Sequence, residues 1–480
     1  MLTAVYSLLL ALVPLLAVAG AGHALLYKRD PRSAFGWIAV CVMFPLAGPL
    51  LYFLFGINRV RTRAQRLTRR FPFELDVGYE RGEYGQPDPV VPAPELPERW
   101  QPLARVSEGV GSRPLLAGNT LEALHDGEAA FPPMLEAIRS AQHRVWLSTY
   151  IFETNATGRA FIDALAQARA RGVEVRVLID GLGELYSWPW AATLLRRRGV
   201  RAARFMPPAV WPPSLHINLR NHRKMLVVDG REAFVGGMNI GDRHLARDTD
   251  NPRRVVDLQF RLRGPVVTQV ATVFAEDWLF VTGETLIPVV AADPEPDGRA
   301  ICRAFSDGPN EDMGRLTTVL IGAVNAARDR IDIMTPYFIP PPDLVSALQS
   351  AALRGVRVRV LLPGTNNLPY VHWASRNLLW ELLQFGVDVR YQPPPFVHSK
   401  LFLVDGHYAL VGSANLDPRS LRLNFELAVE MFSESLGAGL LAHCDEVAHR
   451  ARPTTLAEMD ARPLPVRARD ALCWLFSPYL

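Results

Sequence analysis

An internal duplication constrains the fold of this 480-residue chain more than any other feature of its sequence. Residues 144–152, RVWLSTYIF, precede an amphipathic stretch and the apolar run VEVRVLID, and the same order returns from residues 330–339, RIDIMTPYFI, to VRVRVLLP. Each copy is typical of a β-branched strand, a helix with apolar residues three or four apart, an Arg-Gly-Val turn and a second strand. Alternating strands and helices predict an α/β fold made of two similar lobes.

The duplication continues into a polar motif. Segments 222–240, HRKMLVVDGREAFVGGMNI, and 398–416, HSKLFLVDGHYALVGSANL, each predict two strands joined at an Asp-Gly turn. Alternate residues of a strand project from one face, so the His and the Lys of each copy point the same way. The asparagine follows the histidine at the same distance in both copies (239 − 222 = 17 and 415 − 398 = 17), which argues against coincidence. The motif residues are His222, Lys224, Asp229, Gly237 and Asn239, and His398, Lys400, Asp405, Ser413 and Asn415.

These side chains match the needs of phosphodiester transfer. That reaction requires a nucleophile or base, an acid for the leaving oxygen, and positive donors around the phosphorus. The choice of cation adds to the argument, because the chain has only three lysines, Lys28, Lys224 and Lys400, against 52 − 3 = 49 arginines. An ammonium is compact where a guanidinium is planar, so lysine in both motifs predicts a specific need for the smaller cation.

The N-terminal region predicts a membrane anchor. Residues 1–27 and 33–58 contain no Asp, Glu, Lys or Arg, and each is longer than the ~20 residues that cross a bilayer. We predict a two-helix transmembrane hairpin over 1–58, in which Pro45 and Pro49 kink or interrupt the second helix. A cleaved signal peptide is the alternative for the first segment, and a re-entrant hairpin for the second. Six arginines follow this region, so the positive-inside rule predicts a cytoplasmic catalytic region on the inner (plasma) membrane.

The remaining boundaries follow from composition. We predict a basic segment and Pro-rich linker over 59–115, a first lobe over 116–295 and a second lobe over 296–460. In the C-terminal segment 461–480 the apolar stretch 472–480, LCWLFSPYL, is too short to cross a membrane, so we predict that the segment lies at the membrane interface, with packing on the core as the alternative. A net charge of +4 does not indicate a nucleic-acid binder, and four scattered cysteines predict neither a zinc site nor disulfides.

The paired H-x-K-x4-D motifs, each with a trailing G-[GS]-x-N, resemble the signatures of the phospholipase D superfamily. PLAGPLLYFLFGINR, NLRNHRK and LDPRSLRLNFE resemble its bacterial cardiolipin synthase branch, and Gly237 stands where many members have serine. The resemblance spans nearly the whole chain. It implies two lobes around one shared active site, and phosphatidyl transfer between two phosphatidylglycerol molecules to give cardiolipin and glycerol, without a metal or other cofactor.

The alternative is hydrolysis of a phospholipid, or less plausibly of a nucleic acid, at the same site. The motif does not distinguish water from an alcohol as acceptor. We expect an anionic phospholipid and the membrane as partners, and no nucleic acid. The oligomeric state stays open.

The resemblance also implies roles for the histidines. His222 would be the nucleophile that forms a phosphatidyl-histidine, and His398 the general acid and base, although the residues alone do not rank the two. Each imidazole needs a carboxylate to orient its other nitrogen. Glu426, 28 residues after His398, matches the family position, and Asp257 is its counterpart in the first half.

Phosphate binding is implied for the remaining polar positions of the motifs. Asp229 and Asp405 complete the two motifs, but they lie further along the strand and precede a turn glycine, so the resemblance implies a chiefly structural part for them. The expected phosphate-binding residues are Lys224, Lys400, Asn239, Asn415, Ser413 and Gly237.

Overall fold

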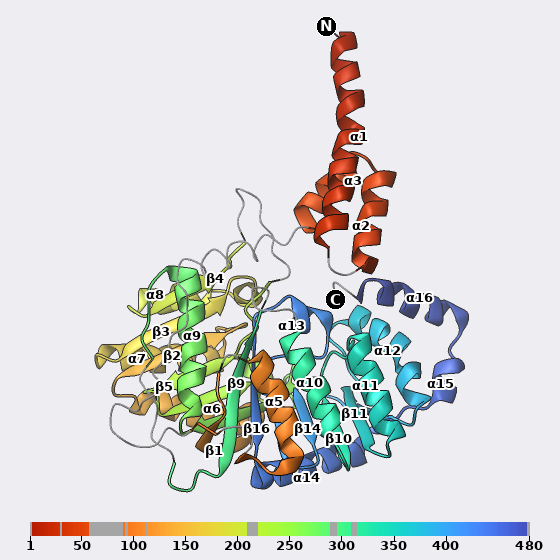
Figure 1. Ribbon diagram of the computed structural model, residues 1–480. Coiled ribbons are helices and arrows are strands. Elements are labelled where there is room, and N and C mark those ends of the chain that lie inside the picture. Colours follow the sequence, from red (N-terminus) through yellow and green to blue (C-terminus); the bar gives the residue numbers. More distant parts are fainter. Residues whose placement is uncertain are drawn as a thin grey trace. The chain divides into compact units, whose positions relative to one another are not determined.

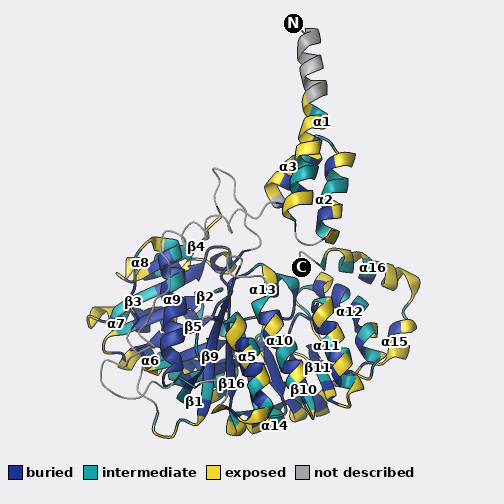
Figure 2. Ribbon diagram, viewed as in Figure 1, coloured by how far each residue is buried: buried dark blue, intermediate teal, exposed yellow. Residues whose placement is uncertain are grey.

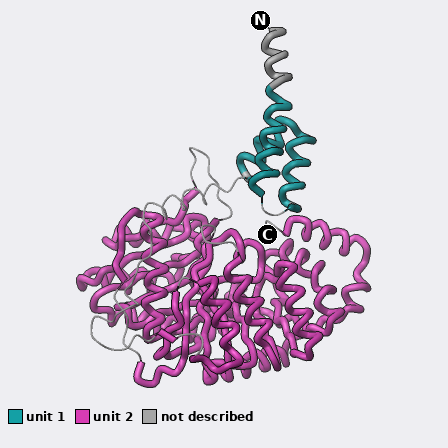
Figure 3. Tube along the Cα trace, viewed as in Figure 1, with its two compact units in different colours: residues 1–72 teal, residues 73–480 magenta. Residues whose placement is uncertain are grey.

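The computed structural model divides the chain into two compact units, residues 1–72 and 73–480 (Figure 3). The predicted basic cluster that follows residue 58 lies outside the described residues. The structure describes residues 2–28, 31–56, 90–91, 95–111, 113–208, 219–288, 295–308 and 314–477.

The first unit is helical. Its elements are α1 (Leu2–Tyr27), α2 (Pro31–Met43), α3 (Ala47–Leu51) and the π-helical turn η1 (Tyr52–Gly56). The second predicted span is therefore not one helix: α2 ends two residues before Pro45, which lacks the N–H that would continue the helical hydrogen bonds. No helix in the described part of the chain is both long and apolar enough to cross a membrane.

The second unit contains one fifteen-stranded sheet (Figure 1). The first half of the chain contributes β1 (Leu116–His125), β2 (Arg144–Thr149), β3 (Glu174–Asp180), β4 (Arg201–Phe205), β5 (Met225–Val228), β6 (Glu232–Gly236) and β8 (Leu258–Arg263). The second half contributes β9 (Ala300–Asp307), β10 (Arg330–Met334), β11 (Arg357–Pro363), β12 (Asp388–Gln392), β14 (Leu401–Val404), β15 (Tyr408–Gly412), β16 (Glu426–Phe432) and β17 (Arg452–Pro453).

The order of these strands confirms the duplication. Outward from the middle, one half runs β1-β8-β6-β5-β2-β3-β4 and the other β9-β16-β15-β14-β10-β11-β12, followed by β17. The halves join where β1 pairs antiparallel with β9, through Leu116 with Cys302 and Asn119 with Ala300. A separate parallel pair, β7 (Val255–Val256) with β13 (Phe396–Val397), also takes one strand from each half. The two lobes thus share backbone hydrogen bonds at both of these strand pairs.

Helices cover the sheet, and their buried faces meet the apolar strands (Figure 2). Helix α9 (Val266–Thr282) is buried along most of its length, which suits its mainly apolar sequence. The first lobe has α6 (Asp126–Ser140), α7 (Ala156–Ala170), α8 (Ala191–Arg197), α9 (Val266–Thr282) and the 3-10 turns η4 (Gly183–Tyr186) and η5 (Asp242–His244). The second lobe has α10 (Arg315–Ala326), α11 (Pro342–Leu353), α12 (Pro369–Leu383), α13 (Pro418–Arg422), α14 (Glu434–Arg450), α15 (Leu456–Asp460) and α16 (Leu464–Leu475).

The predicted linker, 59–115, contains a packed helix. Turn η3 (Glu98–Trp100) leads into α5 (Gln101–Val110), where Trp100 and Leu103 are each 1% exposed. They join the same apolar cluster as Leu316 of α10. Apolar residues three or four apart give α5 one buried face, so the folded body begins well before residue 116.

The C-terminal segment is also packed. Asp470 of α16 is fully buried and accepts hydrogen bonds from Arg376 at 2.7 Å and Arg462 at 2.8 Å. Leu472 and Leu475 on the same helix are 58% and 66% exposed. The helix therefore packs on the body through buried Asp470 and through Trp474, and turns Leu472 and Leu475 outward.

Candidate active site

Each catalytic motif is anchored by the backbone of the opposite lobe. The His222 N–H donates to the Phe425 carbonyl at 2.9 Å, and the His398 N–H donates to the Val256 carbonyl at 2.8 Å. Residues next to these contacts form cross-lobe bridges, Asn221 with Phe425 and β13 with β7. Because β5 and β14 begin just after the histidines, these bridges bring both motifs to one place between the lobes.

Each histidine lies beside a carboxylate that comes from the other lobe. His222 Nδ1 lies 3.2 Å from Glu426 Oε2, and His398 Nδ1 lies 2.8 Å from Asp257 Oδ2. Both carboxylate side chains are completely buried. The sequence named Glu426 and Asp257 as the orienting carboxylates without pairing either with one histidine, and in the structure each lies beside the histidine of the other half. Each imidazole is left with Nε2 as its reacting nitrogen.

The motif lysines lie beside the histidines. Lys224 Nζ donates to the His222 carbonyl and Lys400 Nζ to the His398 carbonyl, each at 2.6 Å. Burial lowers the pKa of Lys224 to about 7 and that of Lys400 to about 8. Burial, with the charges of these lysines, also lowers the pKa of both histidines. The free site therefore has neutral imidazoles and ammonium groups that an anion would stabilise.

The two asparagines are held in place by their neighbours. The Ile151 N–H donates to Asn239 Oδ1 at 3.0 Å, and the backbone N–H of Asn239 donates to His244 Nε2 at 3.1 Å. Asn415 Nδ2 donates to Ser420 Oγ at 3.2 Å. Within the described residues, Asn415 Oδ1 is a buried atom with no hydrogen-bond partner. The Ser420 hydroxyl can donate as well as accept, so Asn415 is able to turn its N–H groups toward a phosphate.

The motif aspartates lie at the far end of the strands from the histidines. Asp229 accepts the backbone N–H groups of residues 142–144 at 2.7 to 2.8 Å. Asp405 accepts those of residues 328–330 at 2.9 to 3.0 Å. These groups precede and begin β2 and β10, so both carboxylates tie one strand end to the next. These contacts suit the chiefly structural part that the resemblance implied, and a direct catalytic part for the two aspartates stays a prediction.

Residues 134–278 and 320–447 match the family described as cardiolipin synthase, phospholipase D-like domain, which is more than half of the chain. The chain belongs to the cardiolipin synthase family. Residues 8–56 match the family described as phospholipase D-nuclease N-terminal.

Individual relatives agree with this assignment. The cardiolipin synthase of Geobacillus sp. (strain WCH70) is 32% identical over 461 residues, which cover 95% of this chain and 90% of the relative. Cardiolipin synthase A of Pseudomonas putida (strain KT2440) is 33% identical and covers 88% and 87%. The crystal structure of phosphatidylserine synthase from Haemophilus influenzae has the same fold, with a TM-score of 0.60 at 16% identity over 79% of this chain and 100% of that one.

The structure explains the glycine at 237 in this cardiolipin synthase family member. A Cβ atom at Gly237 would lie 2.5 Å from Asp257 Oδ1, whereas the matching Ser413 donates its hydroxyl to Glu426 Oε2. In the first motif Asp257, whose side chain is shorter than that of Glu426, stands beside Gly237. Asp257 Oδ1 accepts the Leu258 N–H at 2.8 Å in place of a serine hydroxyl. Ser413 and Gly237 therefore both lie against the orienting carboxylates, and their part in phosphate binding stays a prediction.

Several supporting residues were missed in the sequence. Asp180 accepts the Arg220 guanidinium at 2.7 Å and the Asn221 N–H at 3.0 Å, and the pair is buried. Arg223 forms a second buried ion pair, with Asp277. These pairs hold the segment that delivers His222, and a run of polar residues next to the motif, NLRNHRK, was the available signal.

Two tyrosines and a third histidine also lie at the site. The Tyr150 ring is 5.2 Å from the His222 ring, and the Tyr337 ring is 6.5 Å from the His398 ring. Each tyrosine follows the first strand of its repeat, but when the two repeats are aligned the tyrosines differ in position by one residue. His244 is 1% exposed, and burial lowers its pKa to about 3, so it accepts the Asn239 N–H as a neutral ring.

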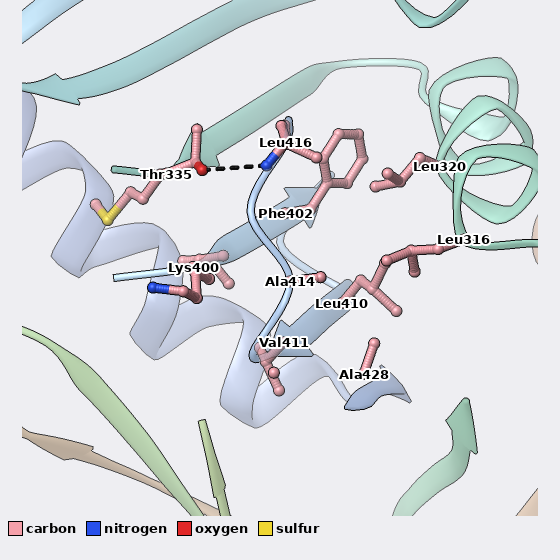
Figure 4. Close-up of a pocket in the computed structure, with 13 residues that line it drawn as sticks. Leu316, Leu320, Thr335, Lys400, Phe402, Leu410, Val411, Ala414, Leu416 and Ala428 are labelled. Carbon is pink, nitrogen blue, oxygen red and sulfur yellow. Dashed lines mark hydrogen bonds between the residues drawn. The ribbon is translucent and has the colours of Figure 1, made fainter. Parts of the chain in front are cut away.

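An apolar pocket lies behind the second motif (Figure 4). It is bordered by Leu316 and Leu320 of α10 and by Phe402 of β14, and Lys400 is its charged member. The Leu416 N–H donates to Thr335 Oγ1 at 3.4 Å beside it. Neither histidine lines this pocket, so the chemistry belongs to the polar cluster between the lobes.

Proposed function

We propose that this protein transfers the phosphatidyl group of one phosphatidylglycerol molecule to another, giving cardiolipin and glycerol. The observation that carries the proposal is the pair of histidines, each anchored and oriented by the opposite lobe. The chain belongs to the cardiolipin synthase family and covers 90% of the Geobacillus relative. A phosphatidyl transferase is the enzyme class that this family and site support together.

In the first step, His222 Nε2 attacks phosphorus and the bond from phosphorus to the glycerol oxygen breaks. His398 donates a proton to that oxygen, and free glycerol leaves. The phosphate anion of the donor adds negative charge between the lysines, which raises the pKa of the imidazoles and lets His398 hold this proton. Lys224 and Lys400 neutralise the non-bridging oxygens in the transition state.

In the second step, the glycerol hydroxyl of another phosphatidylglycerol gives its proton to His398 and attacks the same phosphorus. The bond between phosphorus and His222 then breaks, and cardiolipin forms. The same group thus serves as acid and then as base, and atoms and charge return to the starting state.

The carboxylates favour His222 as the nucleophile. A phosphorylated imidazole is cationic, so it needs a partner that stays ionised. Burial would raise the pKa of Glu426, but its contacts with His222 and Ser413 outweigh burial and lower it. Burial raises the pKa of Asp257. Glu426 is therefore the firmer anion, and it faces His222.

A product assay tests the reaction. Purified full-length protein with labelled phosphatidylglycerol in detergent should give cardiolipin and glycerol in equal amounts, with and without a chelator. Phosphatidic acid as the main product would establish hydrolysis instead. Loss of activity on chelation would contradict the metal-free reaction.

A trapping experiment tests the roles of the histidines. The His398→Ala protein should accumulate an acid-labile, base-stable label at His222, because no base activates the acceptor. His222→Ala should bind no label. Label at His398 in the His222→Ala protein, with none in the reciprocal variant, would reverse the assignment.

We also place the first unit in the inner membrane, with the second unit on the cytoplasmic side. The apolar segments 1–27 and 33–58 carry no charged residue, and unit 1 turns Leu26, Phe35 and Met43 outward at 70% exposure or more. Such side chains suit lipid better than water. A reporter fused after the last residue should be active in the cytoplasm, and activity only in the periplasm would refute this topology.

A further inference from the structure

The segment between β3 and α8 exposes a cluster of large apolar side chains. We call these four residues the aromatic rim: Leu185, Tyr186, Trp188 and Trp190 are 53%, 59%, 78% and 36% exposed. Single exposed apolar side chains are ordinary, but four within six residues form a patch. Trp and Tyr also have a polar edge, which is the composition that proteins use at a lipid interface.

The base of this segment is tied down, so the exposure of its tip is a property of the fold. Asp180 Oδ1 accepts the N–H groups of Leu182 at 2.9 Å and Gly183 at 3.0 Å. The Thr154 N–H donates to Ser187 Oγ at 2.8 Å. Glu184 is buried and accepts the N–H that begins α8. Gly183 approaches the Tyr150 carbonyl so closely that a Cβ would lie 1.9 Å from its oxygen.

The rim lies close to the active site, because Gly183 of the same segment packs against the Tyr150 carbonyl and the Tyr150 ring is 5.2 Å from the His222 ring. Burial raises the pKa of Tyr150 and of Tyr337, and the neighbouring phenol of Tyr186 adds to both increases. One of these tyrosines contacts the ring of His222 and the other lies near His398. Tyr186 is therefore near enough to the tyrosines of both lobes to act on their phenols, and those tyrosines lie beside the two histidines.

Apolar exposure continues on the second lobe. Tyr370 at the start of α12 is 39% exposed and also acts on the Tyr337 phenol. Helix α16, which packs on α12 through Trp474, turns Leu475 and Phe476 outward at 66% and 58% exposure. In Figure 1, α8, α13 and α16 lie along the same edge of the second unit, and Figure 2 shows the exposed residues of α16.

Charge contributes little to the rim. Arg243 lies 5.7 Å from the centre of the Tyr186 ring, and Arg204 lies 5.2 Å from the centre of the Trp190 ring. Each guanidinium is also paired with a glutamate, Glu153 or Glu184. The rim is therefore apolar and close to neutral, so its binding should depend on burial of the rings and only weakly on salt.

A lipid surface is the occupant that this patch fits. At about 200 Å² for a whole large side chain, the rim exposes about 450 Å², which is less than the ~800 Å² that each partner buries in a stable protein complex. A short segment with aromatic tips is instead suited to the head-group and upper acyl region. Resting on the proposed function, the substrate itself is a lipid that must reach a buried site.

We propose that the aromatic rim inserts into the lipid interface and holds the mouth of the active site at the head-group level. Phosphatidylglycerol then passes from the bilayer to the histidines without crossing water. The insertion itself requires no turnover. It can therefore be tested even in a protein that proves to have another activity.

A fluorescent probe reports the insertion directly. Full-length protein carrying Trp188→Cys is labelled with an environment-sensitive dye and placed in phosphatidylcholine vesicles that contain phosphatidylglycerol. The matched control is Leu353→Cys, because Leu353 is 71% exposed and lies at the end of α11, beside the opposite ends of the strands. Wild-type protein treated with the same dye gives the background signal from Cys473, which is partly exposed.

The expected result is a blue-shifted emission at position 188 that lipids with a quencher on the acyl chain reduce, and no such effect at position 353. High salt should not remove the effect. Equal emission and equal quenching at the two positions would overturn the proposal. Without lipid, the emission at position 188 should not shift to the blue as the protein concentration rises. Such a shift would indicate that a second copy of the chain covers the rim, and would also overturn the proposal.

Kinetics separate the rim from the chemistry. Trp188→Ser should raise KM several-fold for phosphatidylglycerol in vesicles and leave kcat unchanged. With short-chain phosphatidylglycerol dissolved as monomers, the variant should match wild type. An equal loss on both substrates would show that Trp188 acts on the site rather than on lipid access, contrary to the proposal. Absence of cardiolipin from wild type would instead contradict the proposed function and leave the probe results valid.

Discussion

Substitution of Asp405, the aspartate of the second motif, tests whether this residue has a structural or a catalytic role. Asp405 has a carboxylate that is 1% exposed and that accepts three backbone N–H groups and the Arg99 guanidinium at 3.2 Å. Its backbone φ is +52°, in the left-handed region that asparagine tolerates and alanine does not. Asp405→Asn should therefore lose only part of the carboxylate's contacts, and Asp405→Ala should lose them all and add backbone strain.

The magnitude follows from the surroundings of each bond. The Arg330 N–H is partly buried, so its lost bond to a charged acceptor costs about 2 kcal/mol. The N–H groups of Arg328 and Asp329 are exposed, and water replaces much of their loss, at about 0.5 kcal/mol each. Left-handed strain adds about 1 kcal/mol for alanine. We expect a total of about 4 kcal/mol for Asp405→Ala, and about 1 kcal/mol for Asp405→Asn because one acceptor oxygen remains.

Thermal unfolding in detergent measures this loss. A body of about 400 residues unfolds with an entropy of about 0.8 kcal/mol per kelvin, so Tm should fall by about 5 °C for alanine and about 1 °C for asparagine. The folded Asp405→Asn enzyme should keep its kcat within about twofold. The control is His398→Ala, which should abolish turnover with little change in Tm. A hundredfold lower kcat for Asp405→Asn at unchanged Tm would refute the structural role.

Four further outcomes follow from the site. In Glu426→Gln, loss of the carboxylate charge lets the pKa of His222 fall below its already lowered value, so the acid limb of a kcat/KM profile should move to lower pH. The plateau should drop about 10- to 100-fold as a charge-assisted hydrogen bond is lost. For wild type, the fall of kcat/KM with rising pH, which begins as His398 loses its proton, should steepen above about pH 7 to 8 as Lys224 and Lys400 lose theirs. Lys224→Arg should lower the rate strongly, and the Lys224 contribution to that alkaline limb should vanish, because arginine stays charged; a near-normal rate would contradict the need for an ammonium. Gly237→Ser should lower activity despite copying the second motif, because its Cβ would lie 2.5 Å from a carboxylate oxygen; wild-type activity and Tm would contradict this.

The pattern of residues along the chain was enough for the architecture and the reacting groups. A strand and a helix are set by neighbours within one segment, so the duplication predicted two α/β lobes, which the sheet order confirms. The matched spacing of the histidine and asparagine in both copies identified the motifs, since a repeated interval can be read without knowing how the chain folds. The end of α2 before Pro45 could also be predicted from the sequence, because it depends only on a proline within the same segment.

Contacts between distant segments were decided by the tertiary structure alone. His222 and Glu426 are 204 residues apart, and His398 and Asp257 are 141 residues apart. Each histidine therefore meets its carboxylate only because the lobes pair through β1 with β9 and through β7 with β13. The packing of α5 on α10 likewise depends on a partner some 200 residues away. Spacing within one copy carries no information about the other lobe's surface, because the hydrogen bonds that join the lobes form only when both are folded.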